Sequence, residues 1–225
     1  MQILINFVIQ STFKMEKEPY QDQLDALQDI RNMMDNSLRF HHLSGKAGMV
    51  VGILALISVA VTYALLGIAL TDPGYTTAIF QQDAFNALEW QILLLYGTLL
   101  LVSVWSGYFF ARQNAIRAGH SFWNPASIRL IKYMAIPLIT GGILCCIFLF
   151  HHQPAWLAPV TLLFYGLALI NGSKHTLQDV FYLGVLEIVT GLLAAFFINY
   201  GLLFWAFGMG ILHIVYGFHL YRKYE

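Results

Sequence analysis

The sequence is poor in charge. Only 11% of its 225 residues are Asp, Glu, Lys or Arg, whereas ordinary globular proteins have about 25%. The twelve basic and twelve acidic residues give a formal net charge of +0, so nothing in the charge balance suggests nucleic acid as a partner. Hydrophobic residues make up 58% of the chain. A soluble fold of this size cannot bury so many apolar side chains, which disfavours a soluble enzyme and a disordered protein alike.

Cysteine is nearly absent. Cys145 and Cys146 are adjacent, so they provide neither a disulfide framework nor a CxxC motif, and we expect both to be small packing residues. The histidine pairs at 41–42 and 151–152 lack accompanying Cys, HxxxH or HExxH patterns, so we predict no metal site. A haem bundle normally carries paired histidines on facing helices, and His213 has no obvious partner at its depth. We therefore predict no cofactor.

Long apolar runs dominate what is present. A helix that crosses the hydrocarbon core needs about 20 mostly apolar residues. Six such runs occur, at 47–70, 90–111, 130–150, 155–170, 176–198 and 202–220. They are too long and too uniformly apolar to be the alternating strands of a membrane barrel. The sequence thus predicts an all-α, polytopic membrane protein with a six-helix transmembrane domain at residues 46–222.

The basic residues all fall on one side of such a bundle. They occupy the N-terminal arm, the second and fourth connections and the C-terminal tail: Lys14, Lys17, Arg31, Arg39, Lys46, Arg112, Arg117, Arg129, Lys132, Lys174, Arg222 and Lys223. The opposite connections hold Asp72, Asp83 and Glu89 but neither Lys nor Arg. The positive-inside rule then predicts that both termini are cytoplasmic. A wrong helix count would scatter these charges over both sides.

The N-terminal arm has two predicted parts. Residues 1–20 are interpreted as a disordered extension, or as residues upstream of a true start at Met15. Residues 21–45 are predicted to form a cytoplasmic amphipathic helix, because apolar residues recur there at spacings of three and four: Leu24, Leu27, Ile30, Met34 and Leu38. This helix either lies on the bilayer or the bundle, or docks a cytoplasmic protein or a second copy of the chain through residues 21–43.

Two ionisable residues lie deep within predicted spans, where they are energetically expensive. Glu187 lies 13 residues before the turn at Tyr200, and His213 lies 13 residues after it. At 1.5 Å per residue both reach about the same depth. If the two helices are neighbours, the pair can meet and share a proton near neutral pH. The alternative is a neutral hydrogen-bonded pair that pins two helices together.

A second polar cluster closes the fourth span, and its members are Tyr165, Asn171, Lys174 and His175. One interpretation makes these residues the cytoplasmic floor of a ligand cavity that leads to Glu187 and His213. The other is a well-capped turn, with Ser173 or Thr176 as the N-cap of the fifth span and Asp179 in its first turn.

Several segments together resemble a family of uncharacterised bacterial integral membrane proteins. The segments are SLRFHHLSGKAGMVVGILAL, FYGLALINGSKHT, LGVLEIVTGL and GLLFWAFGMGILHIVYG. The resemblance implies a six-helix bundle in a bacterial inner membrane, and it brings no activity with it.

Three functions remain open at this point. The leading hypothesis is a transporter or sensor, not an enzyme, that binds a proton or small ligand around Glu187 and His213. The second is an assembly or signalling partner that works through its N-terminal helix. The third is a membrane enzyme acting on a lipid or quinone, for which we find neither a nucleophile–base set nor an acidic metal motif.

Overall fold

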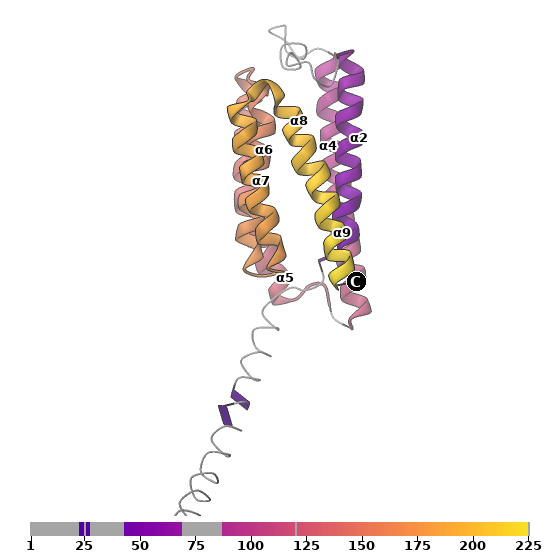
Figure 1. The fold of residues 1–225 in the computed structure, drawn as a ribbon, viewed down its shortest axis with the longest axis vertical. Helices are drawn as coiled ribbons and strands as arrows, with labels where there is room; N and C mark the ends of the chain where they lie inside the picture. The colour runs from indigo at the N-terminus through magenta and orange to yellow at the C-terminus, as the bar shows by residue number, and fades with distance from the viewer. Residues whose placement is uncertain (1–22, 25, 28–42, 69–86, 120, 225) are drawn as a thin grey trace, which may run out of the picture. The chain divides into compact units, whose positions relative to one another are not determined.

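The computed structural model describes residues 23–24, 26–27, 43–68, 87–119 and 121–224, and all regular structure in these ranges is helical (Figure 1). The elements in chain order are α2 (Gly45–Leu66), α4 (Ala87–Arg117), α5 (Pro125–Phe150), η1 (Pro154–Trp156), α6 (Leu157–Ser173), α7 (Asp179–Phe196), η2 (Ile198–Tyr200), α8 (Gly201–Trp205), η3 (Ala206–Leu212) and α9 (His213–Tyr224). Within the described part of the chain, six segments are long and apolar enough to cross a membrane, in agreement with the predicted number.

The helix boundaries differ from the predicted ones where polar residues continue a helix. The second span reaches Arg117, six residues beyond the predicted end. Residues 171–173, predicted to form a turn, instead complete α6. The reason is local packing: Gly172 lies against Met134 and Leu130 of α5, and the Asn171 amide donates a hydrogen bond to the Tyr133 carbonyl at 3.1 Å.

The start of α5 follows directly from its sequence. Asn124 accepts a hydrogen bond from the Ser127 backbone N–H at 2.9 Å, and the Asn124 N–H donates to the Ser127 hydroxyl at 3.1 Å. Pro125 occupies the first helical position, where its missing N–H costs nothing and its fixed φ suits a helix. This reciprocal capping box explains why α5 begins directly after Asn124, at Pro125.

Residues 40–225 form one compact unit. In it, α2 packs against α4, α9 and η3, while α6 packs against α5 and α7. Contacts of α8 and η3 with α7 join the two groups of helices. Few residues of α4 and α5 are buried, and both present rows of exposed apolar side chains, as helices do when one face is turned to lipid.

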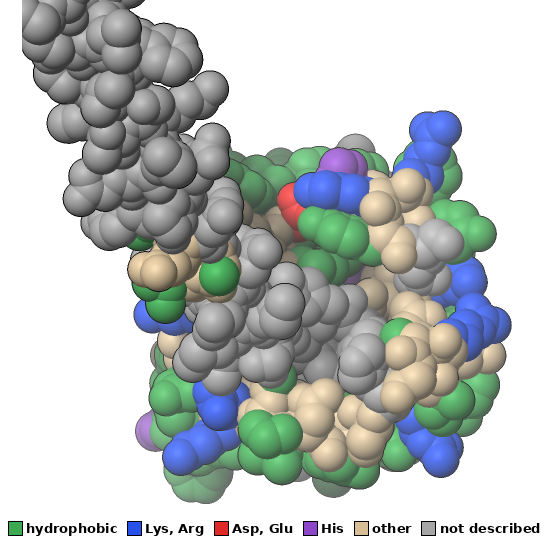
Figure 2. Space-filling model, turned by 90° about the horizontal axis from the view of Figure 1, so that it is seen from below, with side chains coloured by type: hydrophobic (Ala, Val, Ile, Leu, Met, Phe, Trp, Pro, Cys, Tyr) green, Lys and Arg blue, Asp and Glu red, His purple; other side chains and the backbone are tan. Residues whose placement is uncertain are grey.

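One end of this unit carries the basic residues. Asp179 at the start of α7 bonds Lys223 at the end of α9, and Asn171 at the end of α6 bonds Tyr133 at the start of α5. The described Lys and Arg residues all lie at or near these helix ends: Lys46, Arg112, Arg117, Arg129, Lys132, Lys174, Arg222 and Lys223. Figure 2 views this end and shows Lys and Arg side chains around its rim.

The predicted amphipathic helix falls mostly outside the described residues. Within residues 21–45 the structure describes 23–24 and 26–27, which are helical and exposed, and 43–45, of which Leu43 and Ser44 are not helical and Gly45 begins α2. The predicted extension at residues 1–20 lies wholly outside the described part of the chain.

Glycines bring α2 unusually close to the sixth span. A Cβ added to Gly52 would lie 2.6 Å from the Gly210 carbonyl oxygen, and one added to Gly217 would lie 2.6 Å from the Gly45 carbonyl oxygen. No real Cβ approaches a backbone oxygen so closely. Small residues at such positions allow backbones to meet, and dispersion then holds helices together in a bilayer that offers no hydrophobic driving force between them.

The contact between α6 and α7 follows the same rule. Gly166 and Gly184 face each other, because a Cβ on Gly166 would lie 2.6 Å from the Gly184 carbonyl oxygen and a Cβ on Gly184 would lie 2.8 Å from that of Gly166. Ile170 and Ile188 flank the two glycines. The two glycine contacts therefore set the separation of the helices that carry the buried polar residues.

We predict that Gly184→Ala lowers the free energy of unfolding by about 1–3 kcal/mol, the usual penalty for overpacking, because backbone atoms obstruct the added methyl group. Gly142→Ala is the matched control, since a Cβ at this helical position meets nothing within 4 Å. It should be neutral or stabilising by up to about 1 kcal/mol. Thermal unfolding in detergent measures both, and equal stability of the two variants would contradict the close packing of α6 and α7.

Candidate functional site

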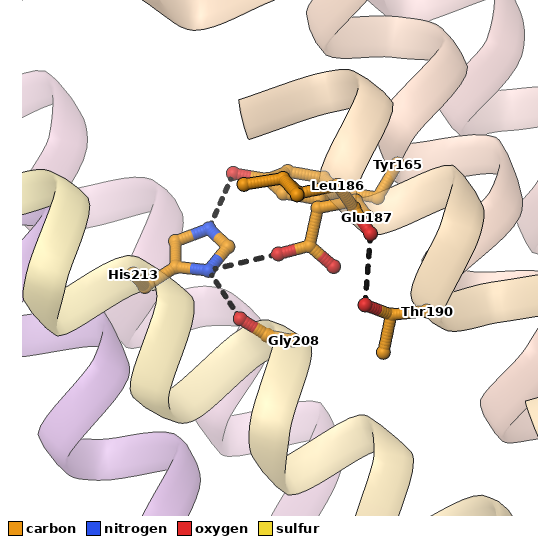
Figure 3. A network of polar contacts seen from close by, with 6 residues as sticks. All are labelled: Tyr165, Leu186, Glu187, Thr190, Gly208 and His213. Carbon is orange, nitrogen blue, oxygen red and sulfur yellow. Dashed lines mark hydrogen bonds and ion pairs between the residues drawn. The ribbon is translucent and has the colours of Figure 1, made fainter. Parts of the chain in front are cut away.

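Three polar side chains from three helices, two of them buried and one partly buried, meet inside the bundle (Figure 3). Glu187 comes from α7, His213 opens α9, and Tyr165 comes from α6. The exposed fractions of Glu187 and His213 are 0% and 4%. The structure thus brings together three of the six predicted site residues, and the equal depth inferred for Glu187 and His213 agrees with their contact.

The imidazole of His213 is held at both nitrogens. Its Nδ1 lies 3.0 Å from the Gly208 carbonyl oxygen, and its Nε2 lies 2.9 Å from the Tyr165 hydroxyl. A carbonyl oxygen only accepts, so Nδ1 must carry the hydrogen of that bond. In the neutral ring Nε2 is then the acceptor and the Tyr165 hydroxyl the donor. The surrounding groups therefore select a single tautomer of neutral His213.

Glu187 is close to this ring but poorly satisfied. Its Oε1 lies 3.3 Å from His213 Nδ1, within ion-pair distance. Neither carboxyl oxygen has a hydrogen-bond partner, however, because the Nδ1 hydrogen is directed to the carbonyl of Gly208. A Cβ at Gly208 would lie 2.6 Å from Glu187 Oε2, so the absence of a side chain at Gly208 makes room for the carboxyl group.

The backbone beside the site is a π-helix. The segment η3, residues Ala206–Leu212, ends immediately before His213. Gly208 faces Glu187, and Gly210 faces Leu56 of α2, so the segment is wedged between two helices. Single π turns within α-helices occur frequently at functional sites. The sequence predicts a regular helix for the sixth span, because a π turn leaves no signature in hydropathy.

Two apolar clusters enclose the polar group. Toward the basic end lies a cluster of Leu169, Leu177, Val180, Leu183 and Leu220. Toward the other end lies a cluster that includes Ala55, Val59, Leu162, Ala194 and Trp205. The site is thereby placed in low-dielectric surroundings, where charge–charge interactions are strong and an uncompensated charge is costly.

The remaining predicted site residues lie apart from this group, at the basic end. Asn171 bonds the backbone of Tyr133, and the His175 ring stacks on the Tyr133 ring with centroids 4.7 Å apart. Lys174 is exposed. Burial lowers the pKa of His175, and the positive charges of Arg129 and Lys174 lower it further. His175 is therefore held toward its neutral form, and its described contacts are with α5.

Ser173 is not the cap of the fifth span, so that half of the predicted alternative is wrong. The Ser173 hydroxyl donates to the Ile170 carbonyl within α6 at 2.7 Å, and α7 begins only at Asp179, after Gln178. Because α6 continues through Ser173, this residue is not available to cap the next helix. Asp179 does lie in the first turn of α7, as predicted, where a carboxylate is favoured by the helix dipole.

Tyr165 was assigned to the wrong part of the molecule by sequence reasoning. It lies eight residues before the end of α6, and Glu187 lies eight residues after the start of α7. Both are thus about 12 Å from that end at 1.5 Å per residue. The same depth count that paired Glu187 with His213 would have placed Tyr165 beside them. The role of the Gly208 carbonyl had no comparable signal.

Comparison of the chain with protein families, with curated proteins and with solved structures finds no match. Among the described residues, no group of three His, Cys, Asp or Glu could hold a metal ion.

We predict that neutral His213 carries its proton on Nδ1. In protein labelled with ¹⁵N-histidine, the Nδ1 resonance should be pyrrole-like and the Nε2 resonance pyridine-like at alkaline pH. Tyr165→Phe should shift the Nε2 resonance and destabilise the protein by about 1 kcal/mol, the usual worth of one such hydrogen bond. Tyr200→Phe, at an exposed position near the turn, is the control. A pyrrole-like Nε2 in the wild type would contradict this arrangement.

Proposed function

We propose that this chain is an integral membrane protein that binds a proton at the Glu187–His213 pair and uses it as a transporter or sensor. The observation that carries this proposal is the Glu187 carboxyl group, which is 0% exposed and has no hydrogen-bond partner at either oxygen. It lies 3.3 Å from an imidazole nitrogen. A charged group buried without partners in apolar surroundings is costly, which is the physical argument for a proton at this pair.

The Glu187–His213 pair can hold one additional proton in either of two ways, or it can lack that proton. With one proton beyond the neutral imidazole, it exists either as a carboxylic acid beside neutral His213 or as a carboxylate beside an imidazolium. Both are neutral overall. Loss of that proton leaves a bare carboxylate in an apolar environment, which is strongly unfavourable unless the surroundings change. Release of the proton is therefore coupled to a structural change or to the arrival of another cation.

The π-helical segment is the element best placed to undergo that change. Gly208 both accepts the hydrogen bond of His213 and lies against Glu187. If the imidazole becomes charged, Nε2 also acquires a hydrogen and the Tyr165 hydroxyl must turn to accept it. The proton thus alters the contacts of α6, α7 and the sixth span together. A two-state change in this segment is a plausible physical basis for either transport or sensing.

The orientation in the membrane belongs to the same proposal. The basic end of the unit, defined by the eight described Lys and Arg residues above, faces the cytoplasm by the positive-inside rule. Both termini are then cytoplasmic, and the membrane is the inner membrane of a bacterium. The lipid bilayer is the partner of the exposed apolar rows of α4 and α5.

We predict that the wild-type protein takes up one proton at a buried carboxyl group and that Glu187→Gln abolishes this uptake. In infrared difference spectra between alkaline and acidic pH, wild-type protein should show a carboxylic C=O band that the variant lacks. His213→Gln should shift the pH at which the band forms, because the neighbouring imidazole no longer contributes to the energetics of the carboxylate.

His151→Gln is the control for His213, because His151 lies exposed after the end of α5. The alternative is a pair that only pins α7 to α9. It predicts no carboxyl band in the wild type, and reduced stability in Glu187→Gln and His213→Gln with no change in pH response. That result would overturn the proposed function and leave a structural role.

A further inference from the structure

On the basic side of the site, α7 and α9 carry polar residues from the basic end of the unit to the Glu187–His213 pair. Asp179, Leu183 and Glu187 recur every four residues on α7, so they share one helix face. At one end of this face Glu187 contacts His213 at 3.3 Å. At the other end, about 12 Å along the helix axis, Asp179 accepts hydrogen bonds from Lys223 at 2.9 Å and Tyr224 at 2.8 Å.

Tyr216 lies between these two contacts. It is three residues from His213, about one helical turn toward the basic end. Its hydroxyl is buried and has no hydrogen-bond partner. Asp179 and Tyr224 are the groups that act electrostatically on it. The Tyr216 ring packs on the same apolar cluster as the ring of Tyr165. The Tyr216 hydroxyl therefore lies between the exposed basic end and the buried site.

An unpartnered buried hydroxyl is destabilising, and a bridging water is its usual partner. A hydroxyl group can also accept one proton while donating its own, so it transfers a proton with no net change in its own composition. Leucine or phenylalanine would fill this position among Leu183 and Leu220 without that penalty. The presence of tyrosine therefore requires a reason other than packing.

We propose that the Tyr216 hydroxyl relays protons between the cytoplasmic end and the Glu187–His213 pair, with Asp179 at the mouth of the route. In each transfer, a hydronium on the side of Asp179 gives a proton to the Tyr216 oxygen and becomes water, while Tyr216 gives its own proton to a water on the side of His213, which passes it to the Glu187–His213 pair. The route rests on the proposed function, because it needs a proton-binding pair at its inner end.

The ionisable groups around the route are consistent with proton transfer from the basic end toward the Glu187–His213 pair. Asp179 and Glu187 face it from α7, and Tyr165 faces it from α6. From α9 itself come His213, His219 and Tyr224, and Lys46 of α2 lies over the neighbouring Tyr221 ring at 5.1 Å. Figure 2 shows acidic and basic side chains side by side at this end, at the edge of a recess with hydrophobic side chains in its floor. The mouth therefore offers a carboxylate to protons arriving from the inner aqueous phase.

The test is a stopped-flow pH jump on the full chain in detergent, with a pH indicator dye reporting proton uptake. We expect Tyr216→Phe to leave the amplitude unchanged and to slow uptake by on the order of tenfold or more, as loss of a positioned proton-transfer group does. Its stability should be equal to or higher than that of the wild type, because the variant removes an unpartnered polar group. Tyr182→Phe is the control, since Tyr182 is 59% exposed on α7.

Asp179→Asn provides a second variant. The Asp179 side chain lies at the partly exposed end of the helices, and the amide that replaces it cannot accept and release a proton as a carboxylate does. This variant should also retain the amplitude and slow the uptake. If Tyr216→Phe and Asp179→Asn both bind protons at the wild-type rate, the route is overturned while the proposed function stands. If Glu187→Gln retains the wild-type amplitude, the proposed function itself fails.

Discussion

The close approach of helix backbones at glycine is the constraint on which the rest of the structure depends. Gly52 and Gly217 allow α2 and the sixth span to meet, and Gly166 with Gly184 does the same for α6 and α7. In a bilayer, helix association relies on such packing and on a few hydrogen bonds. These contacts hold α6, α7 and the sixth span at separations that let one tyrosine, one glutamate and one histidine touch. Larger residues at the glycines would move the three side chains apart.

The polar group is stabilised in some respects and strained in others. The imidazole has a partner at each ring nitrogen, whereas the carboxyl group beside it has none at either oxygen. A site selected only for stability would satisfy both residues, because a partly satisfied buried network is worse than an apolar core. The imbalance is easier to understand if the carboxyl group must change its protonation state. Enclosure by two apolar clusters makes that change energetically large, and so able to drive a rearrangement of neighbouring helices.

The sequence was informative wherever a single physical rule decided the outcome. Apolar run length predicted six spans, and an equal residue count on either side of Tyr200 predicted that Glu187 and His213 share a depth. Prediction failed where side-chain contacts between helices decided the outcome. Asn171 extends α6 because a carbonyl of α5 accepts from it. The depth of Tyr165, by contrast, could have been counted along α6 as it was for Glu187. The π turn depends on tertiary wedging between Glu187 and Leu56, which no pattern of residue types reveals.

That π turn has a consequence for how the chain tolerates length changes. A π turn accommodates one residue more than the α-helical turn it replaces, so the sixth span contains, in effect, a one-residue insertion ahead of His213. Removing one residue from 206–212 would restore a continuous α-helix with the segments on either side in nearly the same register, whereas an α-helix of unchanged length would rotate everything beyond it by about 100° around the axis. The imidazole would then point away from Glu187 while the hydrophobic character of the span stayed the same. A substitution that removes the π turn without shortening the chain would therefore keep the hydrophobic span and separate His213 from Glu187.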